Sequence, residues 1–235
     1  MSDVANMRID VTPHGPYAVT GGVPLVRVKI VTNDKGESVS WEQTGSYEVG
    51  ECYVLCRCGH SHNKPFCDGT HCEIHFDGTE TATHAEYADE AGVVRGEGVD
   101  LLDDEKFCIG ARFCDRAGSV WTLTEESADP KKRELAVEEA ALCPSGRLAM
   151  YIEELKKLNE PEFAGGPSIA IIEDPLNKAS SALWVRGGIP VYAGSGEAYE
   201  TRNRQTLCRC GGSGNKPFCD ASHYGLGFVD GHQED

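Results

Sequence analysis

The sequence predicts an α+β protein, in which two small β-rich domains pack together within one chain and a mixed α/β segment is inserted between them. Three observations support this fold class. A 17-residue segment occurs twice, at residues 55–71 and 207–223, with 13 identical positions. Short apolar runs of strand length lie before both copies. Residues 105–152, between the copies, contain a stretch with helical spacing.

The β-rich domains depend on apolar runs and on a second, weaker repeat. Gly21–Leu25 and Gly187–Val191 share a Gly-Gly-x-Pro pattern at an offset of 166 residues, whereas the longer segment repeats at 152. The first copy therefore carries fourteen extra residues, which a hairpin around Thr32–Gly36 would absorb, because Asn, Asp and Gly favour turns. The predicted domains are 8–80, 95–158 and 165–230. The predicted strands are Tyr17–Val19, Leu25–Val31, Leu183–Val185 and Ile189–Tyr192.

Composition excludes several classes of protein. The 235 residues include 22 Lys and Arg against 38 Asp and Glu, which gives a net charge of −16. Nucleic acids and anionic membrane surfaces would repel such a chain, so neither is an expected partner. No run approaches the roughly 20 apolar residues of a membrane-spanning helix. The first residues, MSDVANMRID, do not form a signal peptide, and we therefore expect a cytoplasmic protein.

The cysteines point to metal. There are 11, an odd number, and they fall into three separated groups, as expected where several ligands must reach one small centre. The repeated segment presents C-x-C, eight residues, C, three residues and H. Three thiolates and one imidazole suit either zinc or an iron–sulfur cluster. Zinc sites usually use C-x-x-C, however, so the single residue between Cys56 and Cys58 favours a cluster. Asp68 and Asp220 stand where each could cap a short helix that carries the histidine.

Both copies resemble the CDGSH iron–sulfur family, whose motif is C-x-C-x-x-[S/T]-x-x-x-P-x-C-D-G-[S/A/T]-H. The first copy has every fixed residue. The second has all but one, because Ala221 stands where the motif has Gly; the added methyl restricts the backbone but removes no ligand. The matching residues are Cys56, Cys58, Ser61, Pro65, Cys67, Asp68, Gly69, Thr70 and His71 in the first copy, and Cys208, Cys210, Ser213, Pro217, Cys219, Asp220, Ser222 and His223 in the second.

The resemblance implies one 2Fe-2S cluster per copy, with two cysteines on the inner iron and one cysteine and one histidine on the outer iron. The mitoNEET-like members are homodimers with an intertwined β-sheet fold, so the tandem copies are expected to form an intramolecular pseudo-dimer with approximate twofold symmetry. Cys52 and Cys72 lie outside the motif and are expected to be buried or partly buried packing residues. The implied ligands are Cys56, Cys58, Cys67 and His71, and Cys208, Cys210, Cys219 and His223.

The middle segment predicts a helix that leads into a further cysteine. Ser127 or Asp129 can cap a helix over 130–142, and Pro130 suits its first turn. The helix ends at Cys143, which is followed by proline. This ending, after an earlier C-x-x-x-x-x-C, is similar to the divergent single-cluster ferredoxins. The bacterial ferredoxin run is C-x-x-C-x-x-C with a distant C-P.

Only three cysteines of that ferredoxin pattern are present. Cys108 and Cys114 match its first and third positions and Cys143 matches its C-P, while Ala111, which cannot bind iron, occupies the second. We therefore expect a 3Fe-4S cluster on Cys108, Cys114 and Cys143. A 4Fe-4S cluster with an outside ligand and a ferredoxin-like fold without metal are the alternatives.

The function expected from these sites is electron transfer. The sequence has no nucleophile–base arrangement, phosphate loop or dinucleotide fingerprint, so we do not expect an enzyme. The expected partner is a redox protein or an apo iron–sulfur acceptor, and the chain is expected to act as a monomer. A cluster donor or a redox or pH sensor is the first alternative, because an acid-sensitive histidine ligand would loosen the outer iron. A zinc-stapled structural module is the second.

Overall fold

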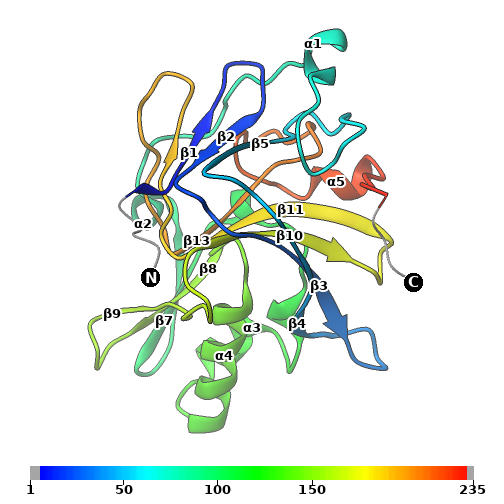
Figure 1. Ribbon diagram of the computed structural model, residues 1–235. Helices are drawn as coiled ribbons and strands as arrows, with labels where there is room; N and C mark the ends of the chain where they lie inside the picture. The colour runs from blue at the N-terminus through cyan, green and yellow to red at the C-terminus, as the bar shows by residue number, and fades with distance from the viewer. Residues whose placement is uncertain (1–5, 232–235) are drawn as a thin grey trace.

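The computed structural model describes residues 6–231, which form three β-sheets and five α-helices (Figure 1). The first sheet has the order β12-β1-β2-β5, the second β13-β11-β10-β3-β4, and the third β6-β7-β8-β9. In chain order, the strands are β1 (Arg8–Val11), β2 (Tyr17–Thr20), β3 (Leu25–Thr32), β4 (Ser38–Tyr47), β5 (Cys52–Leu55), β6 (Gly92–Arg95), β7 (Val99–Asp103), β8 (Leu148–Ile152), β9 (Lys157–Asn159), β10 (Ser168–Asp174), β11 (Ala179–Arg186), β12 (Val191–Tyr192) and β13 (Arg204–Leu207).

The helices are short except for one in the middle segment. Two 3₁₀ turns, η2 (Glu105–Phe107) and η3 (Phe113–Asp115), lie in the same segment. None of the helices within residues 6–231 is long and apolar enough to cross a membrane. The helices are α1 (Thr70–Glu73), α2 (Tyr87–Glu90), α3 (Val120–Glu125), α4 (Pro130–Leu142) and α5 (Ser222–Gly225).

The two repeats exchange strands. In the first sheet, β12 of the second repeat pairs in parallel with β1 of the first, opposing Val191 to Ile9. In the second sheet, β3 of the first repeat pairs in parallel with β10 of the second, opposing Leu25 to Ile169. Leu25 and Val191 occupy equivalent positions of the Gly-Gly-x-Pro repeat, so equivalent strands make equivalent pairs. Each repeat therefore contributes strands to both of these sheets.

Backbone hydrogen bonds between the repeats show the same equivalence as the strand pairs. The amide of Ile9 donates to the carbonyl of Pro190 at 3.0 Å, and the amide of Ile169 donates to the carbonyl of Pro24 at 2.9 Å. The extra residues of the first repeat form the predicted hairpin, in which β3 turns into β4 around Asn33. Its strand β4 lengthens one edge of the second sheet. The fourteen-residue difference between the two repeat offsets is thus explained by an added hairpin.

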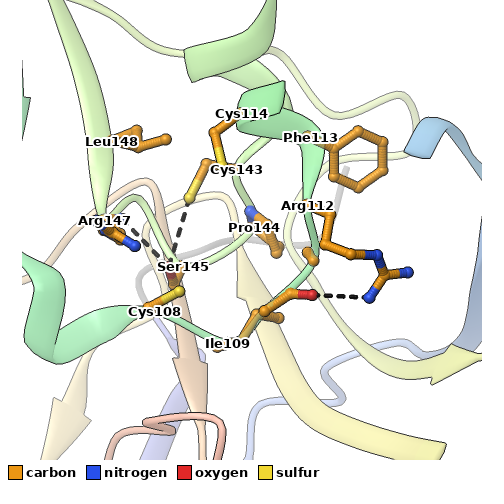
Figure 2. Close-up of a pocket in the computed structure, with 12 residues that line it drawn as sticks. Cys108, Ile109, Arg112, Phe113, Cys114, Cys143, Pro144, Ser145, Arg147 and Leu148 are labelled. Carbon is orange, nitrogen blue, oxygen red and sulfur yellow. Dashed lines mark hydrogen bonds between the residues drawn. The ribbon is translucent and has the colours of Figure 1, made fainter. Parts of the chain in front are cut away.

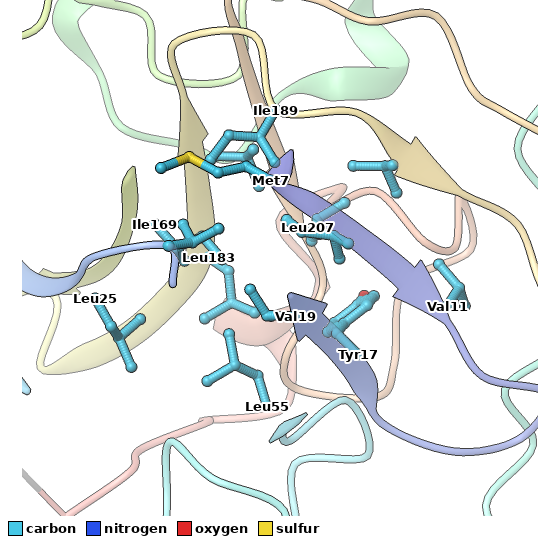
Figure 3. Packing of buried hydrophobic residues seen from close by; sticks show 14 of the residues in the cluster. Met7, Val11, Tyr17, Val19, Leu25, Leu55, Ile169, Leu183, Ile189 and Leu207 are labelled. Atoms are coloured by element: carbon cyan, nitrogen blue, oxygen red, sulfur yellow. The ribbon is translucent and has the colours of Figure 1, made fainter. Parts of the chain in front are cut away.

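Strand β10 was not among the strands that the sequence predicted, and it lies at the centre of the molecule. Every residue of β10 is buried. Ile169 and Ile171 pack into a core shared by both repeats, whereas Ala170 and Ile172 on its other face pack against the middle segment. A strand covered on both faces has no polar alternation, so its sequence lacks the usual strand signal. Figure 3 shows the shared core, with labelled side chains from both repeats.

The middle segment forms its own sheet, with α3 and α4 packed on it. Helix α4 begins and ends as predicted: Asp129 accepts a hydrogen bond from the amide of Lys131, and Pro130 occupies the first turn. Ala136 and Ala140, on the predicted apolar face, are fully buried against this third sheet. In Figure 1 these elements lie at the opposite end of the molecule from α1. The α+β class with two β-rich repeat domains is therefore correct.

Candidate iron–sulfur sites

The first repeat brings its four predicted ligands together as two pairs. The Sγ atoms of Cys56 and Cys58 are 3.8 Å apart. Cys67 Sγ lies 3.3 Å from Nδ1 of His71. The first pair follows β5, and the second lies around the start of α1, so the folded loop from 56 to 71 carries the whole ligand set.

The second repeat reproduces this arrangement. Cys208 Sγ and Cys210 Sγ are 3.6 Å apart, and Cys219 Sγ lies 3.5 Å from Nδ1 of His223. Two thiolates bound at about 2.3 Å to one tetrahedral ion lie about 3.8 Å apart, and a thiolate and an imidazole nitrogen lie about 3.5 Å apart. Each pair therefore has the spacing of two ligands on one iron.

The four candidate ligands of each repeat do not converge on one point. Among residues 6–231, no three Cys, His, Asp or Glu side chains come together at the distance that one metal ion needs. The donor set is the three cysteines and one histidine that the resemblance implies, and it is arranged as two pairs.

The surroundings of the C-x-C pair favour loss of the proton from its first cysteine. The pKa of Cys56 is lowered because the thiol of Cys58 hydrogen-bonds to its thiolate, and the backbone amides of Cys58, Gly59 and Ser61 also point toward that sulfur. The pKa of Cys208 is lowered by the same contacts in the second repeat. Because the thiolate is the form that binds metal, these amides favour the ligating state.

Each histidine lies in a one-turn helix, and the residue before each helix has a left-handed backbone conformation. Gly69 precedes α1 with φ 94°, and Ala221 precedes α5 with φ 69°. Asp68 stands one residue earlier than a conventional N-cap, and its Oδ1 accepts from the amide of Thr70 at 3.0 Å, while Oδ2 accepts from the amide of His62 at 2.8 Å. The aspartate thus ties the helix start to the loop of the C-x-C pair, which orients the histidine.

The two ligand loops touch each other across the interface between the repeats. A Cβ atom on Gly59 would lie 2.5 Å from the carbonyl oxygen of Cys210, and one on Gly211 would lie 2.5 Å from that of Cys58. Both glycines have positive φ, +81° and +83°. Only glycine fits this reciprocal contact, which places the two sites side by side.

The arginine between each pair of cysteines is buried, and sequence reasoning did not single it out. Arg57 donates to the carbonyls of Thr12 and Gly78. Arg209 pairs with Glu173 at 2.7 Å and with Asp230 at 2.6 Å. The signal in the sequence was the place of the arginine within C-R-C in both copies. Its burial could not be predicted from that pattern, because a buried arginine requires partners that only the fold supplies.

The surroundings of the two histidines differ. His71 is half-buried, beside an open hollow lined also by Cys72 and His75, whereas only 1% of His223 is exposed. Burial, with a smaller effect of Arg209, lowers the pKa of His223 to about 4, so this imidazole is neutral and able to bind metal at pH 7. The expectation that Cys52 and Cys72 are buried was wrong, because both are exposed. Cys72 Sγ lies 3.3 Å from Nε2 of His71.

The three cysteines of the middle segment line one pocket, together with Ala111 and Ser145 (Figure 2). Cys108 follows η2, Cys114 lies in η3, and Cys143 ends α4. The Sγ of Cys143 lies 3.5 Å from Oγ of Ser145. The structure therefore brings together three residues that are up to 35 positions apart in the sequence.

An arginine holds this pocket in place. Arg147 forms a two-point pair with Asp103, at 2.7 and 3.0 Å, and also interacts with the side chain of Cys108. Burial, followed by the negative charge of Asp115, raises the pKa of Cys114 to about 12. Cys114 therefore stays protonated until a metal displaces its proton. The pair of Arg147 with Asp103 was not expected from the sequence, since it joins residues that are 44 positions apart.

Two protein families match parts of this chain. Residues 14–72 and 181–224 match the family described as "Iron-binding zinc finger CDGSH type". Residues 94–153 match the family described as "Divergent 4Fe-4S mono-cluster". That description names a four-iron cluster and not the three-iron cluster that the sequence favoured. Comparisons with curated proteins and with solved structures gave no match.

Proposed function

We propose that this chain, an iron–sulfur protein with tandem CDGSH motifs on either side of a divergent ferredoxin-like segment, is an electron carrier that holds two 2Fe-2S clusters and one cluster of ferredoxin type. The observation that carries the proposal is the spacing of the ligands in each repeat: two pairs at 3.3 to 3.8 Å, each suited to one iron. An iron–sulfur cluster supplies a one-electron couple when it is bound.

The protein's own residues would bind the clusters and set their reduction potentials. Cys56, Cys58, Cys67 and His71 would bind one 2Fe-2S cluster, and the equivalent residues from 208 to 223 the other. Backbone amides directed at the inner thiolates stabilise their negative charge, and hydrogen bonds of this kind raise reduction potentials. The contact between Gly59 and Cys210 brings the two ligand loops close enough to favour electron exchange between the repeats.

In the middle segment, Cys108, Cys114 and Cys143 would hold the third cluster. The matched family's description favours a four-iron cluster. Because Ala111 supplies no thiolate, a fourth iron would take a ligand that is not cysteine. Iron content separates the forms: about seven irons per chain for a three-iron cluster, about eight for a four-iron cluster and about four for an empty segment.

Cluster donation is the second candidate function, and the exposure of the first site favours it. His71 borders an open hollow, where an acceptor protein can approach. Mixing the loaded protein with an apo-ferredoxin separates the two functions. Reversible reduction with the clusters retained supports electron transfer, and rapid appearance of the cluster on the acceptor supports donation.

The setting proposed for either function is a reducing compartment such as the cytoplasm, where the ligand thiols stay free for metal. Because the strand exchange is completed within one chain, we propose that the protein works as a monomer. Its partner would be a redox protein or an apo iron–sulfur acceptor.

A further inference from the structure

The residue after each histidine ligand differs between the repeats, and in the second repeat it covers the site. Tyr224 follows His223, and the centroids of the two rings are 4.3 Å apart. The equivalent residue of the first repeat, at the offset of 152, is Cys72, which is small and exposed. Nε2 of His223 is buried and has no hydrogen-bond partner among the described residues.

Tyr224 is held in place by the middle segment. Its hydroxyl lies 2.6 Å from Oδ2 of Asp174 and accepts from Nη1 of Arg112 at 3.3 Å. Arg112 forms a two-point pair with the fully buried Asp174, at 2.7 and 3.0 Å. The tyrosine ring also packs on the backbone of Gly110, because a Cβ there would lie 2.6 Å from Cε2. Charge-assisted hydrogen bonds of this kind are among the stronger ones in proteins.

The residues after Tyr224 add to this cover. Phe228 is buried against Cys208 and Cys210, and its carbonyl accepts from the amide of Ser180 at 2.9 Å. In the first repeat the counterpart of Phe228 at the 152-residue offset is Phe76, which is only partly buried, and the exposed Cys72, His75 and Asp77 lie with it around the open hollow beside His71. One site is therefore enclosed by protein on its histidine side, and the other faces solvent.

We propose that Tyr224, clamped by Arg112 and Asp174, retains the second cluster, and that the first site is the one that exchanges its cluster with a thiol-bearing acceptor. This inference rests on the proposed function. In the exchange, acceptor thiolates replace Cys56, Cys58, Cys67 and His71 on the two irons. The acceptor's thiol protons pass to the released ligands and to solvent. Two irons and two sulfides move together, and no electron is transferred.

Single-site variants of the full chain test whether the first site exchanges its cluster and the second retains it. Cys219→Ser leaves only the first 2Fe-2S site, and Cys67→Ser leaves only the second. Each loaded protein is mixed with excess apo-ferredoxin, and loss of its remaining 2Fe-2S cluster is followed by the electron paramagnetic resonance (EPR) signal of reduced samples. We expect the first site to lose its cluster at least about ten times faster than the second. Equal rates, or a faster second site, would overturn the inference.

Variants of the clamp then test Tyr224 itself, in the Cys67→Ser background. Tyr224→Ala, which removes the ring, should accelerate loss about tenfold, and Tyr224→Phe, which removes only the hydroxyl, should accelerate it less. The control is Cys52→Ala, a change at an exposed cysteine of the first repeat outside the ligand set, in the Cys219→Ser background, and it should leave the rate of the first site unchanged. If Tyr224→Ala does not take up a cluster, Tyr224→Phe provides the test. A rate of cluster loss equal to that of the Cys67→Ser parent would contradict the role of the clamp.

Iron and sulfide content keep this test separate from the proposed function. Loaded protein without iron and sulfide would contradict the proposed function itself. Clusters that load, reduce reversibly and leave both sites at one rate would contradict only the division between the repeats.

Discussion

The buried guanidinium of Arg204, on β13 of the second repeat, donates a hydrogen bond of 2.7 Å to the carbonyl oxygen of Cys143, the last cysteine of the middle segment. The same nitrogen also donates to the carbonyls of Ala140 and Ala141. These carbonyls lie at the end of α4, where a helix runs out of amide donors, although that of Ala140 also accepts from the amide of Cys143. The second repeat therefore fixes the position of a candidate ligand in the middle segment.

Replacing Arg204 should damage both stability and the middle site. Arg204→Met removes the buried charged donor that the end of α4 shares with the partly buried Glu160, and we expect a loss of about 2–4 kcal/mol in the free energy of unfolding. We also expect less iron in the middle segment. Denaturant unfolding and iron analysis measure the two effects. Lys132→Ala is the control, because both partners of its pair with Glu126 are exposed, and it should leave stability nearly unchanged.

The left-handed residue before each histidine helix offers a matched pair of substitutions. Ala221 has φ 69° where the first repeat has Gly69. Ala221→Gly should therefore stabilise the protein by about 1 kcal/mol, and Gly69→Ala should destabilise it by about the same amount. A Cβ on Gly69 would have no atom within 4 Å, so backbone strain alone is tested. Thermal unfolding measures both, and shifts of the same sign would contradict the explanation.

Glu139 should make stability depend on pH. Burial raises its pKa to about 7, and one carboxylate oxygen has no partner among residues 6–231. Because this pKa lies above the value of about 4.3 expected in the unfolded chain, folding takes up a proton, and stability falls as pH rises from about 4 through 7.

Glu139→Gln should remove that pH dependence and stabilise the fold at pH 8 by on the order of 1 kcal/mol. Its Oε1 can still accept from the amide of Ala117. Glu138→Gln, at an exposed neighbouring position, is the control and should keep the slope. Parallel pH profiles for the parent and Glu139→Gln would show that the carboxyl is not held neutral by the fold.

Ala111 should accept a fourth cysteine ligand. It lines the same pocket as Cys108, Cys114 and Cys143, and it occupies the missing ferredoxin position. In Ala111→Cys we expect the iron content to reach about eight per chain, and any EPR signal of a three-iron cluster in oxidised protein to disappear. Iron content that stays at about four would mean that the pocket does not hold a cluster.

His71→Cys should lower the reduction potential of the first cluster. Histidine ligands raise the potential of 2Fe-2S centres relative to thiolates, so the variant should shift negative by on the order of 100 mV. The titration is made in the Cys219→Ser background, where only this 2Fe-2S site remains. His62→Ala, an exposed change in the same loop, should leave the potential where it was. An unchanged potential in His71→Cys would show that His71 is not a ligand.

Local features of this fold could be predicted from the sequence, and long-range ones could not. The capping residues Asp129 and Pro130 were sufficient to predict α4, and Asn33 and Gly36 to predict the hairpin, because these signals act within a few residues. Strand β10 had no alternation to reveal it, since Ile169 and Ala170 are buried on opposite faces.

The candidate sites divide in the same way. The repeated motif was sufficient to propose the two ligand sets, because all four candidate ligands of each lie within 17 residues. The sealing of His223 by Tyr224 depends on Arg112 and Asp174, which lie 112 and 50 residues away from Tyr224. Only the comparison of Tyr224 with Cys72, at the 152-residue offset, could have suggested that the repeats differ there.

Iron and acid-labile sulfide per chain, measured on the loaded protein together with EPR before and after reduction, test the central claim most directly. The account predicts about seven or eight irons, sulfide in similar amount, and the signal of reduced 2Fe-2S clusters after a one-electron reductant is added. Colourless protein that holds zinc, with no sulfide and no signal in either state, would contradict it.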